Sequence, residues 1–77
     1  MCITIRLTTE DDIIEFVNLT RTYESSIDLI KYHHYVDAKS IMGVIALGVY
    51  EQVDVEMISA NEDEIFRFAK DMERFRV

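Results

Sequence analysis

The chain has no proline and only two glycines, Gly43 and Gly48, among its 77 residues. Flexible connections between domains are usually rich in these residue types, so the sequence offers no linker. A length of 77 residues corresponds to one domain with a small core and marginal stability. We therefore expect a single domain over residues 1–77.

Cysteine is equally scarce, because Cys2 is the only one. A lone thiol cannot close a disulfide within the chain and is typical of a reducing compartment. No segment approaches the roughly 20 consecutive apolar residues of a membrane span. The first residues alternate and then reach Arg6, which favours a strand over a signal peptide. These features predict a cytoplasmic location without a membrane partner.

Basic residues are few, since eight Lys and Arg face fifteen Asp and Glu and give a net charge of -7. Nucleic acids and anionic membranes are bound through basic patches, so neither is an expected partner. The sequence also lacks zinc-ligand spacing, a glycine-rich phosphate loop and a serine-histidine-acid pattern. We therefore expect no enzyme activity, no cofactor and no metal site.

Apolar and β-branched residues alternate in four short segments, as is typical of strands. The expected strands span residues 2–7, 27–31, 35–38 and 52–58. Helical spacing predicts three helices, which span residues 9–23, 41–47 and 62–75. The order β-α-β-β-α-β-α predicts an α+β open-faced sandwich, in which a four-stranded antiparallel sheet carries three helices on one face.

Local signals refine this prediction at the turns and helix ends. Thr8 or Thr9 is suited to cap the first helix, and Asn61 the last, where Glu64 would complete an Asx version of the capping box. The turn between the second and third strands is expected over residues 32–34, although it lacks an Asn-Gly signature. The expected core positions of the helices are Ile13, Phe16, Val17, Val44, Leu47, Ile65, Phe68, Ala69, Met72 and Phe75.

The segment from Val36 to Val49 is the most distinctive part of the sequence. It has the pattern of a strand end, a serine that caps a helix, and a short apolar helix that stops at Gly48. This segment resembles the regulatory-serine region of HPr, the small phosphocarrier protein of the bacterial sugar phosphotransferase system. The ferredoxin-like fold shares the first six elements, but the very short second helix and the long last helix are similar to HPr.

The resemblance implies a phosphate-accepting site, but this sequence lacks the residues that form it in HPr. HPr carries phosphate on a histidine just after the first strand, at the start of the first helix, with an arginine close behind. Residues 7–12 contain neither residue type, and Glu10, Asp11 and Asp12 place three carboxylates there. These would repel a phosphate, although acids in a first turn also simply match the helix dipole. We therefore expect that the domain does not carry phosphate on histidine.

The only histidines, His33 and His34, lie in the expected turn. Adjacent residues on an extended chain point to opposite sides, so the pair is poorly suited to chelate one ion. One interpretation is that both histidines are simply polar residues of this turn. The alternative is an active phosphocarrier whose acceptor has moved to one of these histidines.

Ser40 has two interpretations. Its hydroxyl can cap the helix over 41–47, a contact worth about 1 kcal/mol. In HPr proteins of Gram-positive bacteria, the matching serine is phosphorylated by a dedicated kinase, and the product binds transcriptional regulators. A phosphate on Ser40 would meet free backbone N–H groups, and Lys39 adds a cation next to it.

The short helix is apolar on nearly all sides, so part of it is expected to be exposed. Ile41, Met42 and Ile45 have the spacing of one face, and the equivalent surface of HPr docks phosphotransferase enzymes and regulators. Packing on the last helix or on a second copy of the chain is the alternative, and the latter would make the domain a weakly self-associating structural protein. The expected partner-binding residues are Lys39, Ser40, Ile41, Met42 and Ile45.

Overall fold

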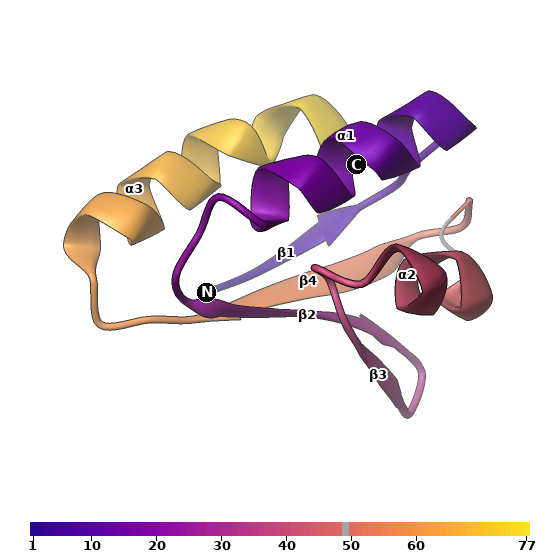
Figure 1. The fold of residues 1–77 in the computed structure, drawn as a ribbon, viewed down its shortest axis with the longest axis horizontal. Helices are drawn as coiled ribbons and strands as arrows, with labels where there is room; N and C mark the ends of the chain where they lie inside the picture. The colour runs from indigo at the N-terminus through magenta and orange to yellow at the C-terminus, as the bar shows by residue number, and fades with distance from the viewer. Residues whose placement is uncertain (49) are drawn as a thin grey trace.

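The computed structural model describes residues 1–48 and 50–77, so Val49, the last residue of the HPr-like segment, lies outside the described residues. The helices and strands are β1 (Cys2–Ile5), α1 (Glu10–Thr20), β2 (Ser26–Lys31), β3 (His34–Asp37), α2 (Ile41–Leu47), β4 (Val53–Ile58), α3 (Glu62–Asp71) and the 3-10 helix η1 (Glu73–Phe75). All strand pairs are antiparallel, in the order β1-β4-β2-β3. The helices cover one face of this sheet (Figure 1), which confirms the predicted α+β class.

Alternation along the strands separates a buried face from an open one. On β4, Val53, Val55 and Met57 are buried, whereas Asp54 and Ile58 are exposed. The buried face packs against the helical stripes predicted from the sequence, which include Ile13, Phe16, Val17, Phe68, Met72 and Phe75. Two aromatic pairs cross the core edge to face, Phe16 with Phe75 at 5.6 Å and Tyr23 with Phe68 at 5.9 Å between ring centroids. The core therefore joins α1, α3 and η1 to the sheet.

Three predicted elements end two or more residues early in the structure: β1, α1 and α3, which ends at Asp71 instead of Phe75 and is followed by η1. β1 ends at Ile5 instead of Leu7, because its partner β4 begins at Val53, which pairs with Ile5. At the outer edge, Ile5 bridges Arg76, and the Arg6 N–H donates to the Phe75 carbonyl. α1 ends at Thr20, because the N–H groups of Thr22 and Tyr23 donate to carbonyls three residues back, as in a turn, and not four residues back, as in an α-helix. The buried Thr20 hydroxyl fixes this end, and it lies within hydrogen-bond distance of the Val17 and Ala38 carbonyls.

The hairpin between β2 and β3 is tighter than the sequence predicted. Its turn has two residues, Tyr32 and His33, and His34 already pairs with Lys31 as the first residue of β3. Tyr32 adopts a φ of 56°, a conformation that glycine and asparagine adopt more easily. The residue types therefore did not indicate a two-residue turn, although the strand pairing requires one.

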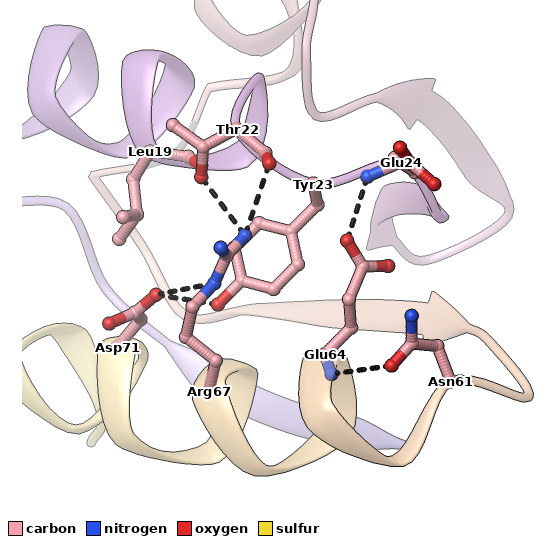
Figure 2. Close-up of polar contacts among 8 residues, drawn as sticks. All are labelled: Leu19, Thr22, Tyr23, Glu24, Asn61, Glu64, Arg67 and Asp71. Atoms are coloured by element: carbon pink, nitrogen blue, oxygen red, sulfur yellow. Dashed lines mark hydrogen bonds and ion pairs between the residues drawn. The ribbon is translucent and has the colours of Figure 1, made fainter.

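The predicted capping box of α3 is only half formed. The Asn61 side chain accepts the Glu64 N–H at 3.1 Å, as expected. The Glu64 carboxylate, however, turns away to the loop after α1 (Figure 2), where it accepts the N–H groups of Glu24 at 2.8 Å and Ser25 at 3.1 Å, and the Ser25 hydroxyl. Glu64 thus joins two segments that are distant in the sequence, instead of closing its own helix.

A second contact between the same segments lies one helical turn further along α3. The Arg67 guanidinium stacks over the Tyr23 ring at 3.9 Å, and the Tyr23 hydroxyl donates to Asp71 at 2.5 Å (Figure 2). Burial, followed by the hydrogen bond to Asp71, raises the pKa of Tyr23 to about 12. Tyr23 therefore stays protonated at neutral pH and keeps its donor role.

Gly48 ends α2 in the left-handed conformation, with a φ of 80°. Its carbonyl accepts the Lys31 ammonium at 2.9 Å, and a Cβ added there would lie 3.3 Å from that nitrogen. We expect Gly48→Ala to lower the free energy of unfolding by about 1 kcal/mol, because an L side chain is strained at this φ. Urea denaturation measures the change.

The matched control is Gly43→Ala, within α2. A Cβ at Gly43 would meet the Ser40 hydroxyl at 3.4 Å and the Val36 Cβ at 3.5 Å, both ordinary contacts. Alanine is the better helix former, so this variant should be neutral or gain up to about 1 kcal/mol. Equal losses in both variants would contradict the conformational explanation.

Candidate functional site

The start of α1 is closed by its own side chains. The Thr9 hydroxyl accepts the Asp12 N–H at 3.1 Å, which confirms the predicted cap. In return, one oxygen of the Asp12 carboxylate accepts the Thr8 N–H at 3.1 Å and the Thr8 hydroxyl at 2.8 Å. The Thr8 hydroxyl and backbone hydrogen bonds lower the pKa of Asp12, so this carboxylate is charged at neutral pH. The helix start presents negative charge where an incoming phosphate would need donors.

Both histidines are far from this helix start. The sheet order places β1, which leads into α1, at one edge and β3, which follows the histidine turn, at the other. His33 and His34 are exposed on the β2–β3 hairpin, on the opposite side of the molecule from α1 in Figure 1. Neither imidazole takes the place of an acceptor at the α1 start.

Ser40 stands exposed at the start of α2, where its hydroxyl accepts the Gly43 N–H at 3.3 Å. The predicted cap is therefore confirmed. Lys39 is half-buried, and its ammonium donates to the Tyr23 carbonyl at 2.7 Å, while its own carbonyl accepts the Arg21 side chain at 2.9 Å. These bonds tie the segment before Ser40 to the end of α1.

The apolar helix α2 divides its side chains differently from the prediction in two places. Val44 is fully buried, and Met42 and Ile45 are 74% and 55% exposed, as expected. Ile41, predicted to be exposed, is instead half-buried against the core, and Leu47, predicted to be core, is only half-buried. A helix of seven residues turns both of its end residues partly toward the sheet. The exposed apolar surface of α2 is therefore centred on Met42 and Ile45.

A shallow groove of about 260 Å³ continues this surface onto α1. The residues that line it are Glu10, Ile13, Ile14, Ile41, Ile45 and Tyr50. The groove joins the start of α1 to the Ser40 helix in one surface. The sequence predicted two separate features, and only the tertiary packing of α1 against α2 brings them together.

Within residues 1–48 and 50–77, no helix has the length and apolar character needed to cross a membrane. In the same residues, no three His, Cys, Asp or Glu side chains are grouped so that they could hold a metal ion.

Comparison with known proteins identifies the family. The sequence model described as "PTS HPr component phosphorylation site" matches residues 13–71. The chain belongs to the HPr family. The matched region begins just after the α1 start and includes all of α2. No curated protein matches the sequence.

Two solved structures from Thermoanaerobacter tengcongensis resemble the chain. A crystal structure of HPr-C-His is 26% identical, with a TM-score of 0.76, and the match covers 96% of this chain and 91% of that one. A crystal structure of an HPr dimer is 30% identical, with a TM-score of 0.65, over 80% of this chain and 74% of the other. The HPr fold therefore extends over nearly the whole chain.

Proposed function

We propose that this HPr-family domain is a cytoplasmic regulatory or protein-binding module that does not carry phosphate on histidine. The observation that carries the proposal is the start of α1, where Thr8, Thr9 and Asp12 form a closed network. The histidine that accepts phosphate in HPr belongs at this helix start. Residues 7–12 contain no imidazole, and the carboxylate charge at this helix start opposes the approach of a phosphoryl group.

The surface around α2 supports a role in protein binding. Met42 and Ile45 are exposed apolar side chains next to the exposed Ser40 hydroxyl and the α1–α2 groove. Apolar surface of this kind is often a protein contact site. The partners that the family suggests are phosphotransferase enzymes, a serine kinase or a transcriptional regulator.

Incubation with the general phosphotransferase enzyme and phosphoenolpyruvate tests the loss of phosphate transfer. We expect no acid-labile phosphate on this chain, whereas an HPr that retains its histidine should be labelled in the same mixture. Acid-labile label that disappears in the His33→Ala, His34→Ala double variant would overturn the proposal. It would establish the relocated acceptor instead.

Ser40 is the proposed regulatory position, because its hydroxyl is exposed and a phosphate there would meet the backbone N–H groups at the start of α2. The Ser40→Asp variant adds a negative charge at this position. We expect it to change the set of proteins that co-purify with the domain, and mass spectrometry of the chain from its host should find the phosphorylated form.

Met42→Asp tests the docking surface. Because Met42 is exposed, the substitution should leave the unfolding midpoint nearly unchanged and reduce partner recovery at least tenfold. The matched control is Phe66→Asp, which places the same charge at an exposed apolar residue of α3. Equal loss in both variants would show that general solubility, and not the α2 surface, governs recovery.

Self-association is a second candidate, which the related structure described as an HPr dimer favours. Sedimentation equilibrium at rising concentration should detect it as an increase in average mass. A monomer throughout the range would eliminate this candidate.

A further inference from the structure

The walls of the α1–α2 groove are apolar, and the charge at its edge is negative. Ile13, Ile14, Ile41 and Ile45 supply the aliphatic surface, and α2 contributes no charged residue over its whole length. Glu10 is the charged side chain in the lining. Asp11 is exposed one position further along α1, on the side next to Ile14. The groove is therefore an apolar surface with an acidic edge.

Three cations near the groove, Lys39, Arg21 and Lys31, are bound elsewhere, which leaves Arg6 as the cation nearest to Glu10 in the sequence. The Lys39 ammonium donates to the Tyr23 carbonyl, and Arg21 donates to the Lys39 carbonyl. Lys31 donates to the Gly48 carbonyl and pairs with Glu51 at 3.2 Å. The charge of Glu10 and Asp11 thus lacks compensation from these neighbours.

The same charge disfavours a second copy as the occupant of this groove. A two-fold contact buries the same patch on each copy, so it would bring two acidic edges into one interface. Each copy also carries a net charge of -7. Opposed carboxylates at such a contact repel, and a basic partner removes that cost.

We propose that the α1–α2 groove binds a protein segment that inserts an apolar side chain and presents Lys or Arg to Glu10 and Asp11. This inference rests on the proposed docking function and specifies the chemistry of the partner. The apolar contact with Ile41 and Ile45 supplies affinity. The paired charges select the partner and speed association, an effect that weakens as salt rises.

Two synthetic amphipathic helical peptides test the charge of the partner. Both have leucine on one face, and the polar face carries lysine in the first and glutamate in the second. Each is titrated into the ¹⁵N-labelled full chain, and amide shifts are followed by NMR. We expect the lysine peptide to shift the amides of Ile14, Ile45 and Tyr50, and to bind at least tenfold more tightly than the glutamate peptide at low salt. A third peptide, with lysine but serine in place of leucine, should not shift these amides.

Matched charge variants separate the groove from the general negative charge of the domain. Glu10→Lys with Asp11→Lys adds four charges and takes the net charge from -7 to -3. Asp28→Lys with Glu56→Lys makes the same change at two opposed acids of β2 and β4, on the open face of the sheet. We expect about tenfold weaker binding of the lysine peptide in the first pair only. Glu10→Gln with Asp11→Asn repeats the test if the reversed charges destabilise the α1 start.

The outcomes separate this inference from the docking function. Equal binding of the lysine and glutamate peptides in the groove would overturn the inference while leaving a docking surface in place. Shifts confined to the open sheet face, or equal losses in both charge-reversal pairs, would also overturn it. Failure of the docking function itself appears independently, as unchanged partner recovery in Met42→Asp.

Discussion

Phe68→Ala should lower the free energy of unfolding by about 3–5 kcal/mol, a large part of the stability of so short a chain. Phe68 is completely buried and packs edge to face against Tyr23. Removing a buried phenylalanine ring costs about 3–5 kcal/mol, since the transfer free energy of the ring is lost and a cavity is left behind. At roughly 0.05–0.15 kcal/mol per residue, a chain of this length has a total stability of about 4–12 kcal/mol. Circular dichroism during heating measures the loss.

Phe66→Ala is the control for this prediction. Phe66 lies two residues earlier on α3, and 73% of its surface is exposed. Removing its ring takes away little buried area, so the unfolding midpoint should move by no more than a degree or two. A comparable loss in both variants would mean that helix propensity, not core packing, determines the effect.

Glu64→Gln should lower the unfolding midpoint at pH 7 and have progressively less effect as the pH falls. The Ser25 hydroxyl, followed by the Glu24 N–H, lowers the pKa of Glu64 below its ordinary value of 4.5. A carboxyl group whose pKa is lower in the folded state stabilises that state at pH values above its pKa in the unfolded state. The contribution is lost as the pH falls through the folded pKa. The amide variant keeps one acceptor oxygen but turns an N–H₂ group toward backbone donors.

Thermal unfolding of both proteins at pH 7 and about pH 3 measures this difference. Glu62→Gln is the matched control, because Glu62 is an exposed acid in the same first turn of α3. The unfolding midpoint of Glu62→Gln should fall only slightly, since only the interaction with the helix dipole changes. A gap between wild type and Glu64→Gln that stays constant with pH would contradict an ionic contribution from this carboxylate.

Much of the fold could be predicted from the sequence because each buried face has a regular period. The alternation Val53, Val55, Met57 and the helical stripe ending in Phe68 and Met72 identified both sides of the core. Caps such as Thr9 and Ser40 depend on residues three positions apart, so local reasoning identified them as well.

Features that depend on distant segments were missed. The Glu64 carboxylate finds its partners 39 and 40 residues away, a contact that no local motif contains. The α1–α2 groove likewise exists only where two helices pack side by side. Nothing in the sequence indicated that Ile14 and Tyr50 line this groove. Strand pairing imposed the left-handed conformation of Tyr32 against its residue preference.

The pairing of the chain end with β1 affects how the domain behaves when concentrated. Arg76 bridges Ile5, and the Val77 N–H donates to the Thr4 carbonyl at 3.2 Å, so part of the outer edge of β1 is covered. The other edge is β3, which has only four residues and ends in a carboxylate at Asp37. Short, charged edges are poor templates for a foreign strand. Samples at the concentrations required for NMR should therefore resist growth into β-fibrils.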